Sequence, residues 1–492
     1  MSKFYLTTPL YYVNAAPHIG HSYTNIAADT LARYKRKSGL EVLFLTGTDE
    51  HGQKVERSAI EAGLSPLEFA NKTVGKFKDL WQKLSISNDD FIRTTELRHT
   101  KAVQKVLDIL YKKGDIYEAK YEGWYCTPCE TFWPQTQGPE QICPDCKRKL
   151  EELSETNFFF KLSKYQDWLT DYFKAHPDFV LPGFRYNEAL SFITQQKLED
   201  LCISRPKARM GWGIEVPFSK EHVTYVWFDA LINYISAAGF ESNAGKFKKF
   251  WPADVHFIGK DILRQHAIYW PIMLRALDLE PPYRIAAHGW WLIGKSQEKM
   301  SKSKGNVIDP AEMVEKFGVD AYRYFLLRDV PFGLDGTFSE SSIIKRYNSD
   351  LANDLGNLVY RTLTMVEKYY SGAVPKALNL APNSIIRNKI AALSGEVEKF
   401  LQRFEFSAAL EVIWGLINLA NKHVEETKPW NLAKENKTEE LKDFIALLVE
   451  VIKKVAEELS CFMPDTAQKI EKQFAKDKII KGQPLFPRID VN

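Results

Sequence analysis

The sequence predicts an α/β protein in which a parallel-sheet domain is interrupted by an inserted module and followed by an all-helical domain. Strand and helix signals alternate over the first fifty residues, which is typical of a parallel sheet. Four clustered cysteines, many aromatics and several prolines give residues 120–221 a different character. From about residue 340 onward, strand signals nearly vanish. A chain of 492 residues also exceeds one hydrophobic core, so about two to four domains are expected.

The sheet domain is predicted in two halves. Residues 4–8 form a short β-type run, residues 18–38 carry a helical pattern that stops at Gly39, and residues 41–46 form an apolar strand run. This order predicts a βαβ unit with parallel strands. The second half repeats the signals as two strands and the helix between them, at residues 255–258, 285–287 and 261–277.

Helical patterns dominate the C-terminal region, as at residues 351–358 and 408–424, and predict an all-α domain. The chain is therefore divided into the two halves of the sheet domain, the insertion, a loop-bearing stretch and the helical domain, at residues 1–117, 223–290, 118–222, 291–348 and 349–492 respectively.

Bulk composition limits the class of protein but not its function. Hydrophobic residues at 45% and charged residues at 26% are ordinary for a globular chain and argue against extended disorder. A net charge of +3 neither requires nor excludes a polyanionic partner. The N-terminus lacks the pattern of a signal or transit peptide, and no long apolar stretch predicts a membrane span. We expect a cytoplasmic protein with no membrane contact.

The first candidate site is Pro17-His18-Ile19-Gly20-His21, which directly follows the first predicted strand. A helix N-terminus attracts phosphate, because its unpaired N–H groups and its dipole meet negative charge. His18 and His21 share one helix face, and Gly20 leaves room for a flat base against the backbone. Taken alone, this motif also fits an ordinary helix start with two surface histidines.

The second candidate site is Lys299-Met300-Ser301-Lys302-Ser303, between Gly294 and Gly305. Two lysines in a small glycine-bounded loop can close over a triphosphate and neutralise charge as pyrophosphate leaves. Taken alone, the motif is typical of a solvated loop. Together and in this order, the two motifs resemble the signatures of class I aminoacyl-tRNA synthetases, with no substitution at the defining positions.

This resemblance implies a Rossmann-like catalytic domain that joins an amino acid carboxylate to the α-phosphate of ATP, which is bound with Mg²⁺. His18 and His21 would contact phosphate, and Lys299 and Lys302 would stabilise the departing pyrophosphate, so these four are the candidate catalytic residues. Positioning and charge stabilisation can supply most of the rate without an acid–base pair. The residues implied to bind ATP are His18, Gly20, His21, Gly259, Asp261, His288, Gly289, Lys299 and Lys302.

Further segments resemble the methionyl-tRNA synthetase family along nearly the whole chain, at residues 10–14, 46–52, 225–234, 257–261 and 266–270. The resemblance implies that L-methionine is activated to methionyl-adenylate and then joined to the 3′ end of initiator and elongator tRNA(Met). It assigns the ammonium group to Asp49, and amino acid and ribose contacts to Asp261. The implied side-chain pocket comprises Leu10, Tyr12, Trp227, Ala230, Tyr234, Ile262, His266 and Trp270.

Aromatic walls with one or two weak donors suit a soft thioether, and Tyr12 and His266 are the candidate donors. Without the resemblance, Trp227, Trp270 and Tyr234 fit ordinary core packing. Sister enzymes for leucine, isoleucine and valine carry a large editing domain in the insertion, because one methylene discriminates weakly. The insertion here is roughly a hundred residues and its middle holds the cysteines, which weighs against these three enzymes. A cysteinyl enzyme would place zinc against its substrate, whereas the four cysteines here are clustered within the insertion, which weighs against that enzyme as well.

Cys126-x-x-Cys129 and Cys143-x-x-Cys146 have the spacing of a tetrahedral four-thiolate zinc site. Four protein ligands leave no open position, so one structural Zn²⁺ is expected. The alternative is two disulfides, which a reducing compartment disfavours.

The helical domain carries candidate RNA-reading residues. Asn353, Asn357 and Arg361 are spaced by four and share a helix face, and Pro429 with Trp430 can present an aromatic plane. The resemblance implies that these residues bind the anticodon and that the domain is an anticodon-binding helical bundle. Taken alone, the stripe fits a solvated face. No C-terminal dimerisation domain is recognised, so a monomer is expected.

Two other classes remain as alternatives. A synthetase-like protein that binds tRNA or adenylate without charging would be expected to lose a signature residue, whereas this chain retains them all. A zinc-dependent nucleic-acid-binding protein explains the cysteines but leaves both nucleotide signatures without a role.

Overall fold

The computed structural model describes residues 2–126, 131–133, 141–144, 147–294, 298–299, 308–376, 385–475 and 478–490. The chain divides into two compact units. Unit 1 comprises residues 1–17, 35–82 and 86–288, and unit 2 comprises residues 18–34, 83–85 and 289–492.

A six-stranded parallel sheet lies at the centre of unit 1, in the order β3-β2-β1-β11-β12-β7. Its strands are β1 (Lys3–Tyr12), β2 (Glu41–Asp49), β3 (Asp90–Arg93), β7 (Val180–Leu181), β11 (Val255–Gly259) and β12 (Ile285–His288). The middle strands are almost continuously buried, as expected where both faces of a parallel sheet are covered. The strands predicted in both halves are thus confirmed. The predicted insertion also contributes a strand, β7, to this sheet.

Helices surround this sheet in unit 1. They are α2 (Gln53–Glu61), α3 (Pro66–Lys83), α4 (Leu97–Lys112), η2 (Leu162–Tyr165), α5 (Gln166–Ala175), α6 (Gly183–Gln195), α7 (Val226–Leu231), α8 (Asn233–Ala238) and α9 (Ala244–Phe250). The helix predicted over 261–277 is confirmed, since residues 260–276 are helical throughout. Its geometry changes along its length, from η3 (Lys260–Ile262) through the π-helical turn η4 (Gln265–Tyr269) to α10 (Trp270–Ala276). Pro271 has no N–H for the carbonyl four residues earlier, which interrupts a continuous α ladder.

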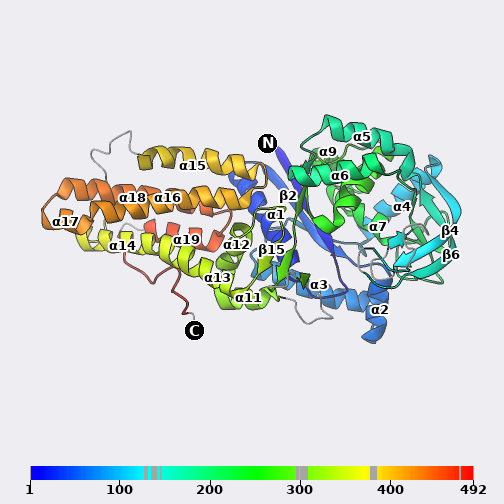
Figure 1. Cartoon of the computed structure of the whole chain (residues 1–492), viewed down its shortest axis with the longest axis horizontal. Coiled ribbons are helices and arrows are strands. Elements are labelled where there is room, and N and C mark those ends of the chain that lie inside the picture. Colours follow the sequence, from blue (N-terminus) through cyan, green and yellow to red (C-terminus); the bar gives the residue numbers. More distant parts are fainter. Residues whose placement is uncertain are drawn as a thin grey trace. The chain divides into compact units, whose positions relative to one another are not determined.

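An antiparallel sheet, in the order β5-β4-β6-β8, occupies the predicted insertion. Figure 1 shows β4 (Ile116–Cys126) and β6 (Glu151–Phe160) as one long curved ribbon. The shorter strands are β5 (Thr131–Trp133) and β8 (Leu201–Cys202), with β9 (Ser204–Pro206) and β10 (His222–Thr224) forming a separate pair.

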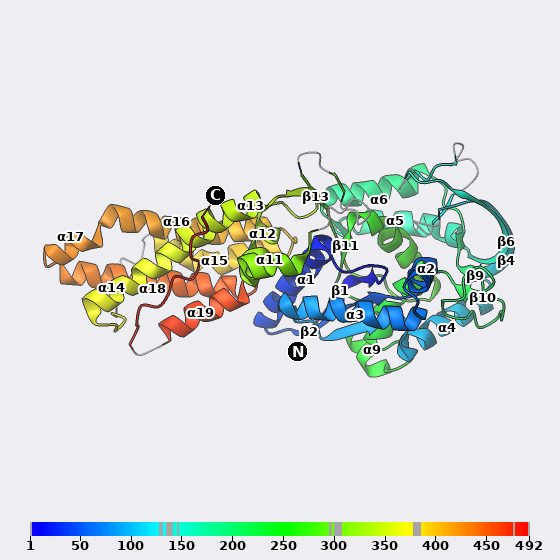
Figure 2. The same ribbon diagram turned by 90° about the horizontal axis from the view of Figure 1, so that it is seen from below.

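Helices make up most of unit 2, which confirms the all-α prediction for the C-terminal region. Its long helices α14, α16 and α18 lie side by side in Figures 1 and 2. The helices are α11 (Pro310–Phe317), α12 (Val319–Arg328), α13 (Glu340–Arg346), η6 (Tyr347–Gly356), α14 (Asn357–Tyr370), α15 (Ile385–Leu401), α16 (Phe406–Thr427), α17 (Pro429–Lys434), α18 (Thr438–Leu459) and α19 (Pro464–Phe474). Unit 2 also contains a small sheet, formed by β13 (Trp291–Ile293) and β14 (Glu298–Lys299), which precede α11, and by β15 (Gly336–Phe338), which lies between α12 and α13.

Most of the first helix, α1 (Ile19–Lys37), belongs to unit 2 although it follows β1 in sequence. The Asp29 carboxylate lies 2.7 Å from the guanidinium of Arg323, and both side chains are fully buried. Arg323 also donates to the carbonyls of Phe462, Cys461 and Leu84. The buried Arg323 of α12 therefore links this helix to α1 by an ion pair and to the loop after α18 by hydrogen bonds.

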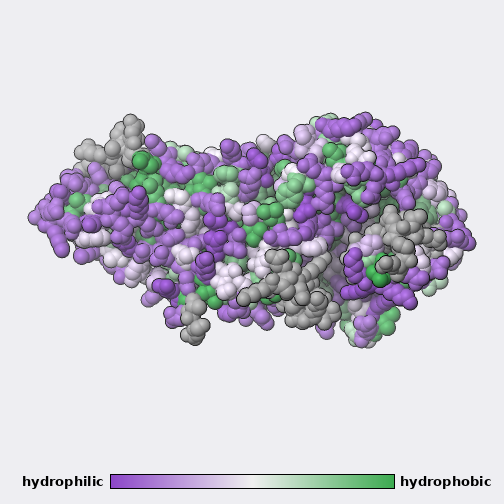
Figure 3. Space-filling view, in the orientation of Figure 1, coloured by the Kyte–Doolittle hydropathy of each residue, from purple (hydrophilic) through white to green (hydrophobic). Residues whose placement is uncertain are grey.

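The surface shows no extended apolar region on the face drawn in Figure 3, where hydrophobic residues form small separate patches among hydrophilic ones. In the part of the chain that the structure describes, no helix combines the length and hydrophobicity of a membrane span.

Candidate functional site

The carboxyl ends of the parallel strands carry several predicted site residues. Tyr12 and Asp49 are register partners at the ends of β1 and β2, and Gly259 and His288 pair at the ends of β11 and β12. Open parallel sheets bind their ligands at this edge. A Cβ at Gly259 would lie 2.5 Å from Oδ1 of Asp261, so a side chain there would displace the carboxylate that follows the strand.

Tyr234 and His266 form a hydrogen-bonded pair inside unit 1. His266 Nδ1 lies 2.9 Å from the Ile262 carbonyl, which can only accept, so Nδ1 carries the proton. Nε2 of His266 then accepts from the Tyr234 hydroxyl at 2.7 Å. Burial lowers the pKa of His266 to about 4, partly offset by the hydrogen bond to Ile262 and by Asp261. The imidazole is therefore neutral at physiological pH.

A second histidine supports Tyr234 from the other side. The His256 ring stacks on the Tyr234 ring with 4.1 Å between centroids. Its Nε2 accepts from the Trp270 indole at 3.2 Å, so its Nδ1 proton points to the Thr7 hydroxyl at 2.8 Å. Burial and His266 lower the pKa of His256 well below its ordinary value. The only sequence signal for this role was a histidine inside the apolar strand run at 255–258.

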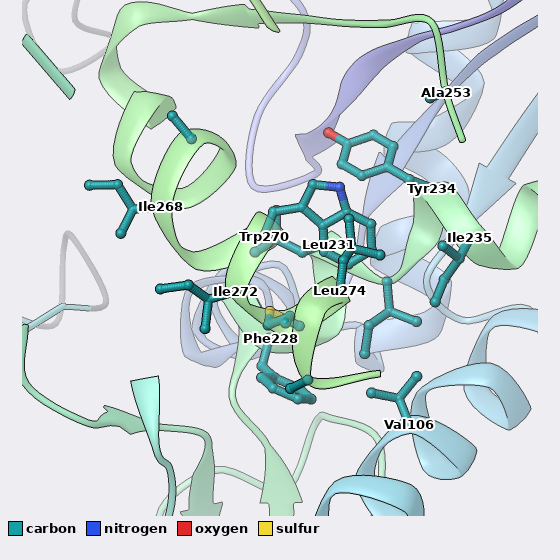
Figure 4. Packing of buried hydrophobic residues seen from close by; sticks show 14 of the residues in the cluster. Val106, Phe228, Leu231, Tyr234, Ile235, Ala253, Ile268, Trp270, Ile272 and Leu274 are labelled. Carbon is teal, nitrogen blue, oxygen red and sulfur yellow. The ribbon is translucent and has the colours of Figure 1, made fainter. Parts of the chain in front are cut away.

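The structure brings part of the predicted methionine pocket together. Figure 4 shows Tyr234 and Trp270 close to each other in the main hydrophobic cluster, with ring centroids 5.8 Å apart. Leu10 and Ile262 pack against the same cluster. Tyr12 packs on a separate small cluster. Of the remaining predicted pocket residues, Ala230 is buried and Trp227 half-buried, both on α7.

Asp229 holds helix α7 in place, a role that its sequence did not reveal. Its carboxylate meets Nδ1 of His51 at 2.7 Å and Nε2 of His99 at 2.6 Å. Burial alone would raise the pKa of Asp229, but the two histidines lower it below its ordinary value. The three side chains link the end of β2, helix α4 and the helix that carries Trp227. The Asp229 network therefore fixes the frame of the predicted pocket.

The first signature forms the start of α1 in unit 2. The His18 and His21 rings stack with centroids 3.8 Å apart. His21 Nδ1 accepts the N–H of His18, and His18 Nδ1 accepts the N–H of Gly20. In each neutral ring the proton therefore sits on Nε2. A Cβ at Gly20 would lie 3.0 Å from the His18 ring, so only glycine leaves that ring unhindered.

The second signature is described only in part. Lys299 ends β14, whose backbone pairs with Leu292 of β13. Lys302 lies outside the described residues.

Gly289, another predicted ATP-binding residue, lies close to the Leu334 carbonyl. A Cβ at this position would lie 2.1 Å from the Leu334 oxygen, so only glycine fits there.

Two of the four predicted zinc ligands are described, and they lie together. Cys126 and Cys143 are fully buried in one small cluster with Leu150. The turn that presents Cys143 is held by hydrogen bonds of its N–H to Arg148 at 2.8 Å and of its carbonyl to Lys147 at 2.9 Å. Cys129 and Cys146 lie outside the described residues. Among the residues that are described, no group of three or more His, Cys, Asp or Glu could hold a metal ion.

The predicted anticodon residues lie in two places in unit 2. Nη1 of Arg361 donates to Glu425 at 2.5 Å, and its guanidinium lies 6.0 Å from the Trp430 ring centroid. Trp430 is 40% exposed, enough to offer a ring face, and the preceding Pro429 starts α17. Asn353 and Asn357 are exposed and line a groove of about 660 Å³.

Comparison with known proteins links both units to one family. The model for class I tRNA synthetases (M) matches residues 4–152 and 149–363, and the model for the anticodon-binding domain of tRNA ligases matches residues 383–491.

Curated relatives include the methionine–tRNA ligases of Caldanaerobacter subterraneus subsp. tengcongensis and Clostridium perfringens. Each is 49% identical to this chain over 99% of its length, covering 79% and 78% of the respective relative. Among solved structures, Mycobacterium tuberculosis methionyl-tRNA synthetase in complex with methionyl-adenylate has a TM-score of 0.93 and 38% identity. That match covers 99% of this chain and 100% of the solved one.

Proposed function

The chain belongs to the methionine–tRNA ligase family of class I aminoacyl-tRNA synthetases, and on this premise we propose which of its residues perform each step. It is an ATP-dependent ligase that activates methionine to methionyl-adenylate and charges tRNA. The observation that carries this assignment is the identity to methionine–tRNA ligases along 99% of the chain.

The activation step needs positioned positive charge. A methionine carboxylate oxygen bonds to the α-phosphorus of ATP, and the bond from that phosphorus to the bridging oxygen breaks as pyrophosphate leaves with the electron pair. We assign the phosphate contacts to Nε2–H of His18 and His21, a proposal supported by the tautomers fixed at the start of α1. Lys299 and Lys302 would neutralise the departing pyrophosphate, and Mg²⁺ would accompany ATP.

The remaining ATP contacts are assigned to the strand ends, because carboxyl ends of parallel strands meet at one edge. Gly259, Asp261 and His288 stand there, and Gly289 follows. Asp49, buried at the end of β2, is the proposed partner of the methionine ammonium group.

The methionine side chain would lie against Leu10, Tyr12, Trp227, Ala230, Tyr234, Ile262, His266 and Trp270. The neutral Tyr234–His266 pair supports this proposal, because an uncharged aromatic wall suits a nearly apolar thioether. The N–H of His266 is bonded to the Ile262 carbonyl, so His266 is not free to act as the weak donor that was predicted, and Tyr12 stays the candidate. Because Trp270 is fully buried, we propose that it packs behind Tyr234 and supports the pocket, as well as contacting methionine directly.

We propose one structural Zn²⁺ held by Cys126, Cys129, Cys143 and Cys146. The two described thiols fit it, since both are buried side by side and sulfur is a ligand that zinc prefers. The ion would close the tip of the β4–β6 sheet. Removal with a chelator should release about one zinc per chain and lower the melting temperature, and a preparation that melts unchanged after complete zinc release would contradict a structural role.

For tRNA(Met), we propose that Asn353, Asn357, Arg361, Pro429 and Trp430 contact the anticodon. The exposed Trp430 face beside Arg361 suits a stacked base. We also propose that the protein is a monomer and that it acts in the cytoplasm. The domain division stays as predicted from the sequence.

Methionine-dependent ATP–pyrophosphate exchange tests the activation step. Exchange with methionine, and none with leucine or cysteine, is expected. Lys302→Ala should lower the exchange rate far more than it weakens methionine binding, and equal losses in both would refute its role in the transition state. Absence of exchange altogether would leave a protein that binds without charging.

A further inference from the structure

The groove of about 660 Å³ in unit 2 has one wall that the anticodon assignment does not use. Helices α13, η6 and α14 form the first wall. The second is residues 478–490, the C-terminal strap, which runs alongside α14 toward α13 in both Figures 1 and 2.

Specific contacts hold the C-terminal strap on the helices. The Ile479 N–H donates to the Gly372 carbonyl at 2.7 Å, and Asn348 exchanges two hydrogen bonds with the Ile489 backbone at 2.8 and 2.9 Å. Between these points the Phe486 ring meets Tyr347 edge to face at 5.7 Å. The strap is therefore fixed near both ends, and the groove is formed before any ligand arrives.

Among the described residues, the charged side chains that line the groove are all positive. Lys345 of α13 and Arg488 of the strap line opposite walls, and both are exposed. Within the described part of the chain, neither has an ion-pair partner, and no acidic residue is among those lining the groove. The carboxylate of Asp350 on the same helical stretch is already bound to Arg346 and Tyr324. Two unpaired cations without a counter-charge favour an anionic ligand.

The other lining groups favour a nucleic acid over a small anion. Asn353 and Asn357 offer amides, and Tyr360 and Phe486 offer rings. Lys481 of the strap lies 4.3 Å from the centroid of the Tyr360 ring and adds positive charge at that end. The segment beneath, η6, is a π-helix of ten residues, a rare geometry that is common at functional sites. Cations that can contact phosphates, amides that can bond to ribose or bases, and rings that can stack on bases together match RNA.

We infer that this groove binds the sugar–phosphate backbone of the tRNA anticodon arm, with Lys345 and Arg488 as phosphate contacts from its two walls. The inference rests on the proposed function and deepens it. The C-terminal strap becomes part of the tRNA-binding surface, in addition to the bases read at Arg361 and Trp430. Backbone contacts carry no sequence information, so Lys345 and Arg488 contribute affinity, while discrimination is left to the residues assigned to the anticodon.

The test measures tRNA binding at several salt concentrations for Lys345→Ala and Arg488→Ala. Each should raise Kd by up to about fivefold at low salt and reduce the slope of log K against log salt by about 0.7. The factor should be equal for tRNA(Met) and for the same tRNA with a changed anticodon. Methionine-dependent pyrophosphate exchange, which needs no tRNA, should stay at the parent rate.

Two variants keep the test sharp. Lys399→Ala removes an exposed lysine of α15 that does not line the groove, and should leave the salt slope unchanged. Lys345→Arg keeps the charge and should retain binding, which separates lost charge from lost folding. A normal slope in both alanine variants, with exchange and charging intact, would overturn the groove assignment alone. Weakening confined to the cognate anticodon would overturn it in favour of base reading. Loss of exchange in the parent protein would instead remove the proposed function.

Discussion

Removal of the Arg323 side chain should destabilise unit 2 strongly, although Arg323 belongs to none of the proposed sites. Its guanidinium is fully buried, pairs with the buried Asp29 and donates to three backbone carbonyls. Arg323→Met keeps most of the volume but removes all of these donors. Breaking one side of a buried ion pair costs about 3–5 kcal/mol, because the remaining charge stays desolvated.

The structure places the expected cost at the lower end of that range. Arg33 also contacts the Asp29 carboxylate at 2.7 Å, so this carboxylate keeps one partner in the variant. We therefore expect a loss of about 3 kcal/mol in the free energy of unfolding of unit 2. For a unit of this size, that loss corresponds to a fall in melting temperature of roughly 6–12 °C.

Calorimetric melting of the full chain measures this effect, since two units can give separate transitions. Arg33→Met is the matched control. It removes the partly exposed partner of the same carboxylate and should cost about 1 kcal/mol or less. A loss below about 1 kcal/mol for Arg323→Met, or equal losses for the two variants, would refute the view that burial makes the links of Arg323 stronger than that of Arg33.

Three further predictions concern the proposed sites. Tyr234→Phe removes the donor to His266 and should raise the KM for methionine in pyrophosphate exchange several-fold while lowering stability by about 1 kcal/mol; an unchanged KM would separate the pair from the substrate. Burial lowers the pKa of His266 from an ordinary 6.5 to about 4, so the unfolded chain takes up this proton first. His266 should therefore contribute a fall of about 3 kcal/mol in the free energy of unfolding as pH drops from 6.5 to 4, in addition to the contribution of His256 in the same direction. His266→Gln should make that part of the denaturation profile less steep. Trp430→Ala should spare exchange but impair charging of tRNA, and charging at the parent rate would remove this ring from the anticodon site.

Local patterns predicted the secondary structure well where a single periodicity dominated. The apolar runs at 41–46 and 255–258 became β2 and β11, and the pattern over 18–38 became α1. The helix predicted over 261–277 is present, but its π-helical turn was not predictable, because the turn changes the backbone hydrogen bonds without changing the hydrophobic pattern. The structure places Asp49 at the end of β2 and Tyr234 beside His266, but their roles toward methionine stay predictions.

The partners of the polar groups were not predictable from the sequence. His51, His99 and Asp229 are far apart along the chain, and nothing in their neighbours shows that they share one carboxylate. The tautomers of His266 and His256 likewise depend on a carbonyl and an indole that only folding places beside them.

The sequence by itself determined the strands of the parallel sheet, the helical C-terminal region, the two signatures and the paired cysteines, because these depend on residues close together in the chain. Only the tertiary structure decided that α1 joins unit 2 through Asp29 and Arg323, that β7 completes the sheet of unit 1, and that the C-terminal strap closes a groove with Lys345 and Arg488. The physical reason is that these contacts join segments that lie far apart in the chain. Which groups become buried or paired depends on how those segments pack, and the residues next to each group in the sequence do not show its partner.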